Sequence, residues 1–450
     1  MGNQLDLDLE DVKQYVPPDY PASTQQQPEC LIGWSDASTG PLLLRIQDHY
    51  SVSYTVVSVI FICNFSGFLL AALTNVWFSD RFGMGKTTLL GAVVHLAGGA
   101  LMAGAPPFPL FVIAFCINGF GLGLQDAQIN GFITRLPNAG SRMSIAHAIY
   151  GLGALVSPLI ATQFARSTFK HWNLHYVCSV AIMAANSATL GYVFRLKRDD
   201  DLFAIYNYVP QAQAHIHGPV VVTDSTTEHP SSQPDPPQTE GGNKVSPSHG
   251  TGEKMMAIAK TPFVHLGGLL AFIYVGIEFT IGSWAVTYIV EVRGGGDDSG
   301  YVSSGFFGGL MVGRVLHVFV SWVISEQNAV LVYMVVALGL QVLVWQVDSI
   351  LGNALAYSMI GIVLGPIFPV LLNGTAAMLD SEMSVGAIGY IAALGQCGSA
   401  LFPFVTGTLS GRFGVEALQP LSVALIGVMS CLWAALLWLT RKRWARAHRF

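Results

Sequence analysis

The amino-acid sequence predicts an all-α membrane protein with twelve transmembrane helices in two pseudo-symmetric six-helix halves. Three observations support this prediction. The 450 residues are 52% apolar and only 11% charged, whereas soluble domains contain about 25% charged residues. Eleven apolar runs are each long enough to cross a bilayer, which takes about 20 residues. A long polar segment divides the helices into two sets.

Short turns that are rich in Gly, Pro and charged residues separate the apolar runs. The runs cover residues 52–78, 87–105, 110–134, 144–165, 174–194, 262–290, 301–324, 329–347, 350–372, 384–408 and 418–440. A weaker run comes first, from Cys30 to about Leu44, and as a helix it reaches only about 22 Å. The first helix is therefore expected to be short or weak. In the run 350–372, Gly361, Gly365, Pro366 and Pro369 are expected to interrupt the helix.

The polar segments define the domain organisation. The expected parts are a polar cytoplasmic tail at 1–29, an N-terminal six-helix half at 30–194, a flexible cytoplasmic linker at 195–261, a C-terminal six-helix half at 262–440 and a basic cytoplasmic tail at 441–450. The linker is rich in Ser, Pro and Gly and cannot bury enough apolar surface to become ordered. Two six-helix halves are an organisation common in secondary transporters.

The positions of Lys and Arg predict that both termini are cytoplasmic. Most of the 22 basic residues, including those of the tail RKRWARAHRF, fall on the side of the membrane that holds the termini. Termini on one side require an even number of spans, which supports counting the weak first helix.

Composition and motifs exclude several functions. The 22 basic residues against 27 acidic ones leave no basic excess for binding nucleic acid. The six cysteines lack the spacing of a zinc site or a disulfide framework, so no metal or other cofactor is expected. No nucleophile, metal cluster or phosphate loop stands in an exposed setting, and the protein is therefore not expected to be an enzyme.

Four ionisable residues lie inside the expected spans, namely Asp36, Asp126, Glu278 and Arg314. A charge at the bilayer centre costs at least about 2.5 kcal/mol, so such residues face the bundle interior and mark an ion or substrate route. A structural alternative remains open for Glu278 and Arg314, since an acid and a base on successive helices also neutralise each other.

The run 110–134 has the richest polar pattern, NGFGLGLQDAQING. Asp126 and Asn130 share a helical stripe, and Asn118 and Gln125 lie on the neighbouring one. Amides in a cavity hydrogen-bond hydroxyl groups. Tight helix packing would explain the glycines, but it does not readily explain the carboxylate. Further candidate cargo contacts are His147, Tyr150, Trp284 and Gln396, although packing explains a lone histidine or tryptophan equally well.

The segment SDRFGMGKT resembles the first cytoplasmic signature of the major facilitator superfamily, with Asp80, Arg81, Gly83 and Lys86 at its characteristic positions. In that family the aspartate engages a helix N-terminus and neighbouring arginines, which holds the outward-facing state. The resemblance implies the same gating role for these residues. The match departs from the signature at Val76, Met84 and Gly85, and the corresponding segment of the second half, ISEQNAV, has lost it.

Two further segments, WSDASTGPLLLRIQ and LQDAQINGF, are similar to a branch of fungal proteins that resemble bacterial fucose/proton symporters. In that branch, carboxylates of the first and fourth helices carry proton coupling and cargo recognition, which implies these roles for Asp36 and Asp126. His147 and Tyr150 align with cargo-contacting amides, and Glu278 stands where the bacterial proteins have an amide. The resemblance also implies a plasma-membrane location. Twelve spans make a complete transporter, so we expect a monomer.

The leading expectation is therefore proton-coupled symport of a small hydroxylated solute, such as a monosaccharide, by alternating access. The proton gradient is the expected energy source, and the expected partners are the cargo, protons and the lipid bilayer, with no nucleic acid. One alternative is proton-driven export of a small metabolite. Another is a non-transporting sensor or degenerate paralogue, to which the weak first helix and the missing second signature point.

Overall fold

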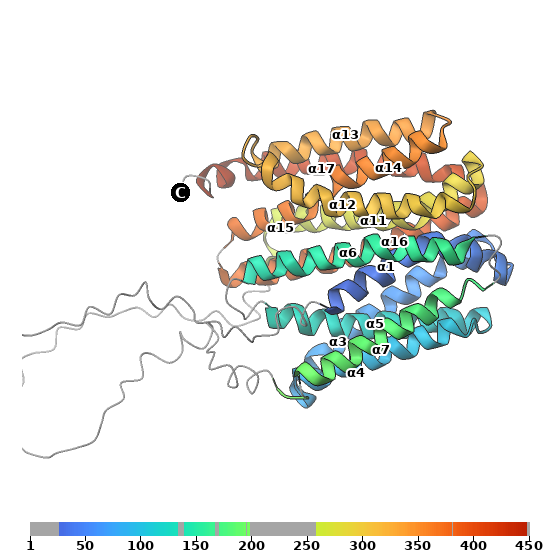
Figure 1. The fold of residues 1–450 in the computed structure, drawn as a ribbon. Helices are drawn as coiled ribbons and strands as arrows, with labels where there is room; N and C mark the ends of the chain where they lie inside the picture. Colours follow the sequence, from blue (N-terminus) through green and yellow to red (C-terminus); the bar gives the residue numbers. More distant parts are fainter. Residues whose placement is uncertain are drawn as a thin grey trace, which may run out of the picture.

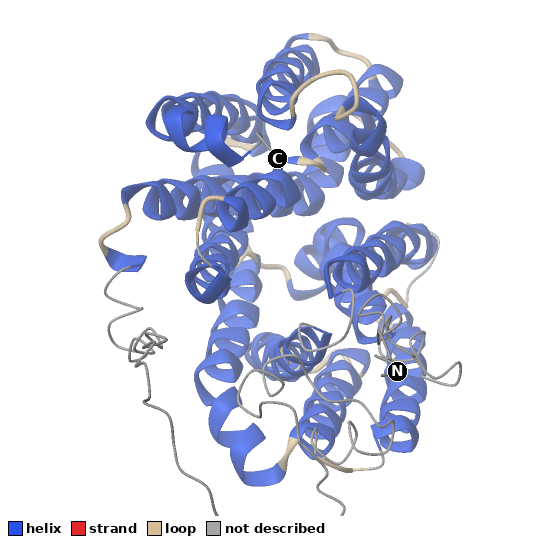
Figure 2. Ribbon diagram, turned by 90° about the vertical axis from the view of Figure 1, so that its left-hand side faces the viewer, coloured by secondary structure: helices blue, strands red, loops and turns tan. Residues whose placement is uncertain are grey.

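The computed structural model describes residues 27–133, 139–166, 171–194, 196–198, 258–379 and 381–447. These residues are almost entirely helical and contain no strand (Figure 2). The first part of the chain forms α1 (Gln27–Tyr50), α2 (Tyr54–Val57), α3 (Val59–Phe82), α4 (Met84–Ala103), α5 (Phe108–Ile133), α6 (Ala139–Ala165) and α7 (Leu174–Phe194). We call these helices the N-terminal bundle.

The second part of the chain forms the C-terminal bundle. Its elements are α11 (Pro262–Arg293), η2 (Asp297–Gly300), α12 (Tyr301–Val320), α13 (Glu326–Gln346), α14 (Ile350–Leu364), α15 (Ile367–Ala377), α16 (Ser381–Phe413), η3 (Val415–Ala417) and α17 (Leu418–Ala447). In Figure 1, helices α11–α14 and α17 occupy the upper part of the view, α3, α4, α5 and α7 the lower part, and α1, α6 and α16 lie between them. The bundles meet where α1 packs on α11, α6 on α12 and α3 on α16.

The expected spans are confirmed. The described residues contain 11 helices that are long and apolar enough to cross a membrane, and the chain is an integral multi-pass membrane protein. The first helix differs from its expected length, because α1 has 24 residues and reaches about 36 Å. It starts before Cys30 and continues past Leu44 to Tyr50. Its polar residues make it less apolar than the 11 helices counted above, and it is not one of them. We call the two ends of the bundle the Gln27 end and the Tyr50 end, after the ends of α1.

Several of the expected polar segments lie outside the described residues. These are residues 1–26 of the first tail, most of the linker, including 199–257, and the last three residues, 448–450. The basic tail was expected to begin at 441, but α17 continues through Ala447.

Glycines allow helix backbones to touch at the crossings that shape the bundles. A Cβ atom added to Gly33 of α1 would lie 2.0 Å from the carbonyl oxygen of Tyr150 in α6, and one added to Gly153 would lie 2.0 Å from that of Cys30. In the C-terminal bundle, a Cβ on Gly313 would lie 1.9 Å from the carbonyl oxygen of Ile362. Small residues at such crossings let membrane helices approach closely.

The expected helix break occurs between α14, which ends at Leu364, and α15, which begins at Ile367. Pro369 has no backbone N–H, so the carbonyl of Gly365, four residues earlier, lacks its helical donor. The Nε of Arg314 donates to that carbonyl at 3.3 Å. The break thus creates an acceptor that holds an arginine of α12 in place.

Candidate functional site

Four polar side chains meet where the two bundles face each other, and we call Asp36, Tyr150, Glu278 and Arg314 the central cluster. Within the N-terminal bundle, the Tyr150 hydroxyl donates to Oδ2 of Asp36 at 3.1 Å. Within the C-terminal bundle, Nη2 of Arg314 lies 3.9 Å from Oε1 of Glu278. Asp36 interacts electrostatically with Glu278, and Tyr150 interacts with both Glu278 and Arg314.

Helix geometry places Asp36 between the bundles. Gly33, Asp36 and Gly40 lie on one stripe of α1. The backbone of α6 touches this stripe at Gly33, and a Cβ on Gly40 would lie 2.3 Å from the carbonyl oxygen of Gly282 in α11. Asp36 therefore stands between α6 and α11, the helices that carry Tyr150 and Glu278.

Glu278 has buried apolar neighbours along its helix. It is buried in α11, flanked by residues such as Ile277 and Ile281 that are also buried. A buried carboxylate is stable only if it is neutral or paired, and Arg314 provides the pair. The expected alternative of an internal Glu278–Arg314 pair is therefore present, and it lies within the central cluster.

Asp126 and His147 flank the central cluster. Asp126, in α5, is half-buried, and the side-chain amide of Asn130 donates to its Oδ1 at 2.8 Å. Asp126 also interacts electrostatically with Asp36. His147 lies one turn from Tyr150 on α6, is exposed, and interacts electrostatically with Arg314.

The other candidate cargo residues take part in helix packing. Asn118 and Gln125 are buried inside the N-terminal bundle, where Asn118 donates to Oδ1 of Asn64 at 3.3 Å and Gln125 accepts from Asn186 at 3.0 Å. Trp284 is fully buried, and its indole N–H donates to the carbonyl of Pro403 at 3.0 Å. Gln396 accepts from Ser399 on its own helix at 3.4 Å. These four residues are not brought into the central cluster.

The loop that carries the signature residues lies at the Gln27 end, between α3 and α4. Asp80, Arg81 and Lys86 are exposed, and Gly83 has a φ of 81°, a conformation that favours glycine. The guanidinium of Arg198 donates to the backbone carbonyl of Asp80 at 2.7 Å. The loop therefore contacts the segment that follows α7.

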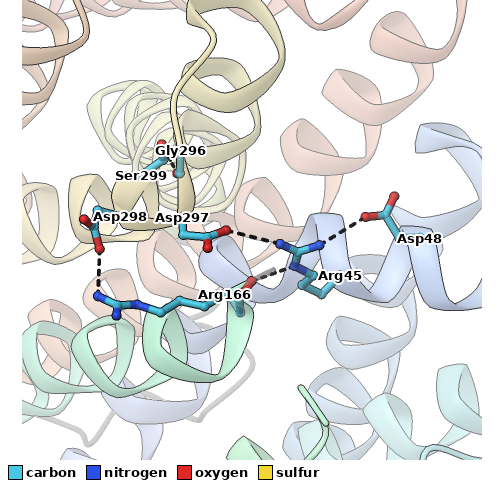
Figure 3. A network of polar contacts seen from close by, with 8 residues as sticks. Arg45, Asp48, Arg166, Gly296, Asp297, Asp298 and Ser299 are labelled. Carbon is cyan, nitrogen blue, oxygen red and sulfur yellow. Dashed lines mark hydrogen bonds and ion pairs between the residues drawn. The ribbon is translucent and has the colours of Figure 1, made fainter. Parts of the chain in front are cut away.

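At the Tyr50 end, ion pairs join the bundles (Figure 3). Arg45 of α1 lies 3.6 Å from Asp297, and Arg166, just after α6, lies 2.8 Å from Asp298. Both acids belong to η2 of the C-terminal bundle. We call Arg45, Arg166, Asp297 and Asp298 the ionic clamp. The Oγ of Thr55 adds a contact of 3.5 Å to the carbonyl of Gly407.

Sequence reasoning missed Glu29 and the ionic clamp. Glu29 was assigned to the polar tail, whereas the structure places it in the first turn of α1, only 2% exposed. Its spacing from Gly33, Asp36 and Gly40 was the available signal, because these four residues fall on one helical stripe. For the clamp, the acids that follow Gly294, Gly295 and Gly296 read as an ordinary turn.

Comparison with known proteins agrees with this architecture. Residues 29–383 match the sequence model of the Major Facilitator Superfamily. Bypass of stop codon protein 6 of Saccharomyces cerevisiae is 25% identical, over 96% of this chain and 86% of its own length. A glucose/galactose transporter of Brucella abortus biovar 1 is 22% identical, over 83% of this chain and 84% of its own. The crystal structure of a D-xylose-proton symporter superposes with a TM-score of 0.67 at 13% identity, covering 92% of this chain and 96% of that one.

The match covers most of the chain and includes the signature loop, α1 and α5. It agrees with the resemblance expected from SDRFGMGKT and with the twelve-helix, two-bundle fold. Members of this family carry small-molecule cargo across membranes and are not enzymes. The chain therefore belongs to the Major Facilitator Superfamily of membrane transporters.

Proposed function

We propose that the protein is a proton-coupled symporter of a small hydroxylated solute of the monosaccharide class, working by alternating access. The central cluster is the observation that carries the proposal. It places the carboxyl group of Asp36, bonded to Tyr150, beside the Glu278–Arg314 pair at the contact between the bundles. The name of the relative that is a glucose/galactose transporter supports the cargo class.

The chemistry of symport follows from Asp36 and its partners. A carboxyl group held away from water favours its protonated form, and a neutral group crosses an apolar interface more readily than a charged one. Protonated Asp36 and the hydroxyl of Tyr150 offer donors and acceptors that match the hydroxyls of a sugar. Arg314 donates further hydrogen bonds from the opposite bundle. The proton therefore lowers the charge at the interface, and the hydroxyls of the cargo satisfy the polar groups there, before the bundles rock.

The ionic clamp supports a conformational assignment within this proposal. Both termini are proposed to be cytoplasmic, at a plasma membrane, in a monomer. The Tyr50 end then faces outward. In this orientation the clamp joins the bundles on the outer side while His147 near the cluster is exposed, and these contacts support the proposal of a state closed on the outer side.

A transport assay tests the proposed function. The purified protein is reconstituted in proteoliposomes, and uptake of labelled D-glucose, D-galactose and a panel of further monosaccharides is measured under an imposed pH step. We expect at least one sugar to accumulate above its external concentration, and to stop doing so when a protonophore collapses the gradient. Equilibration without accumulation for every sugar would contradict proton coupling, and accumulation driven only by a reversed gradient would indicate export.

Neutralising the clamp is expected to favour opening at the Tyr50 end. The pairs are partly exposed, so the double variant Asp297→Asn/Asp298→Asn should destabilise the closed state by about 1 kcal/mol relative to the open state. The ratio of open to closed molecules should then rise about fivefold. Spin labels at cysteines that replace the exposed His171 and Glu416 report the distance between the bundles at this end. The long-distance population should grow in the variant and, because salt screens exposed charges, in wild type at high ionic strength.

The matched control is Asp348→Asn. Asp348 pairs with Arg293 at 3.6 Å within the C-terminal bundle, so its removal should leave the distance between the bundles unchanged. If the clamp variant and this control give the same distance distribution, the clamp does not hold the closed state.

A further inference from the structure

We propose that Glu29 is a proton-carrying residue that exchanges a proton with Asp126 at the Gln27 end of α1. The inference rests on the proposed proton coupling and adds a residue to it. The sequence motifs do not point to this position. Three features of the structure support it: the stripe on which Glu29 lies, the burial of its Oε1 without a hydrogen-bond partner among the described residues, and its electrostatic interaction with Asp126.

The stripe aligns Glu29 with the central cluster. Glu29 and Asp36 are separated by about two helical turns, or about 10.5 Å along α1, and project from the same side. The two carboxyl groups both interact electrostatically with Asp126. Asp126 therefore faces the stripe from α5, between Asp36 on one side and Glu29 on the other.

Burial makes Glu29 unusual for a residue at the start of a helix. It is 2% exposed, and its Oε1 has no hydrogen-bond partner among the described residues. Asp126 interacts electrostatically with it. A buried carboxylate that faces another carboxylate is stabilised when the pair shares a proton.

A second oxygen beside Asp126 is also without a partner. The side-chain amide of Asn130 donates a hydrogen bond to Asp126, and the Oδ1 of Asn130 is buried and unpaired among the described residues. The pair is thus lined by acceptors that a carboxyl O–H or a water molecule can satisfy. Among the described residues, two buried oxygens of the site, Oε1 of Glu29 and Oδ1 of Asn130, have no donor, and a bound proton can supply one.

The proton transfer balances without any other reactant. Protonated Asp126 gives its proton to the carboxylate of Glu29, directly or through one water, and becomes a carboxylate. Glu29 then releases the proton to water at the Gln27 end. Before and after the transfer, the two carboxyl groups together carry one proton and one negative charge. The transfer therefore creates no additional charge in the apolar interior.

A structural role makes a different prediction. An acidic residue in the first turn of a helix stabilises that helix through the macrodipole, whether or not protons move. If this were the whole role of Glu29, the variant Glu29→Gln would lower thermal stability and leave proton movement unchanged. Glu29→Asp retains an acid in both cases and serves as the conservative variant.

The test compares wild type, Glu29→Gln, Glu29→Asp and the control Glu416→Gln, whose glutamate is exposed on η3. Infrared difference spectra across a pH titration measure protonated carboxyl groups without any cargo. We expect Glu29→Gln to lose part of the carboxyl band and Glu29→Asp and the control to keep it. Proteoliposome uptake of D-galactose under a pH step should slow by roughly tenfold in Glu29→Gln, about 1.4 kcal/mol in barrier height, with exchange of D-galactose between compartments much less affected.

The two readouts separate the failure of this inference from that of the proposed function. An unchanged carboxyl band in Glu29→Gln would show that Glu29 carries no proton, whatever the transport result. A wild type that moves no monosaccharide with the gradient would contradict the proposed function, and the infrared band would still decide the role of Glu29.

Discussion

Replacing Asp36 by Asn is expected to abolish uphill accumulation of cargo. Asn keeps the size of the side chain and can still accept from the Tyr150 hydroxyl, which lies 3.1 Å from Asp36 in wild type, but it cannot take up a proton. One coupled charge moving through 100 mV provides about 2.3 kcal/mol, equivalent to about fifty-fold accumulation of a neutral sugar. The variant should therefore reach an inside-to-outside ratio of about one, because the acid proposed to couple proton binding to cargo binding in the central cluster is gone.

The measurement is the steady-state concentration ratio of labelled sugar in proteoliposomes with an imposed pH step and potential. Counterflow exchange in the same vesicles shows that Asp36→Asn still binds and moves cargo. The exposed Asp348→Asn is the matched control and should accumulate as wild type does. Accumulation by Asp36→Asn at the wild-type level would remove Asp36 from the coupling mechanism.

The second large effect is expected from Arg314→Leu. Removing the arginine leaves Glu278 buried in α11 without its cation, and it also leaves the carbonyl of Gly365 without a donor. Breaking a buried pair on one side destabilises a protein by about 3–5 kcal/mol. The variant should therefore melt well below wild type in detergent, as followed by size-exclusion chromatography after heating.

The double variant Glu278→Gln/Arg314→Leu separates the two losses. It removes the stranded charge and should recover part of the stability, while the unsatisfied carbonyl of Gly365 keeps it below wild type. If the single and double variants melt together, the Glu278–Arg314 pair does not stabilise the fold.

The sequence was sufficient to predict most of the helices, because a run of about 20 apolar residues in a bilayer has few alternatives to a helix. The expected 174–194 and the observed Leu174–Phe194 coincide. The exception was α1, whose apolar stretch is interrupted by Asp36, Arg45 and Asp48. Its true length comes from packing against α6 and α11, which composition does not express.

The site was only partly predictable. Ionisable residues are rare in membrane-spanning helices because they are costly there. The sequence alone was therefore sufficient to select Asp36, Asp126, Glu278 and Arg314. Their pairing could not be fixed, since Asp36 and Tyr150 meet only after two helices are placed side by side. Gln125 and Trp284 contact packing partners instead of the central cluster. The sequence could not predict this, because a helix that is apolar on all sides gives little indication of which face points to the cavity.

The polarity of α1 also bears on how the protein is made. A segment with this many polar and charged groups partitions poorly from the translocon into lipid, since each central Asp or Arg opposes insertion. The close packing of α1 on α6, at Gly33 of α1 and Gly153 of α6, cannot form until α6 has been synthesised. We therefore expect α1 to remain at the insertion machinery during early biogenesis and to enter the bilayer together with its neighbours, so that assembly, rather than hydrophobicity, retains it in the membrane.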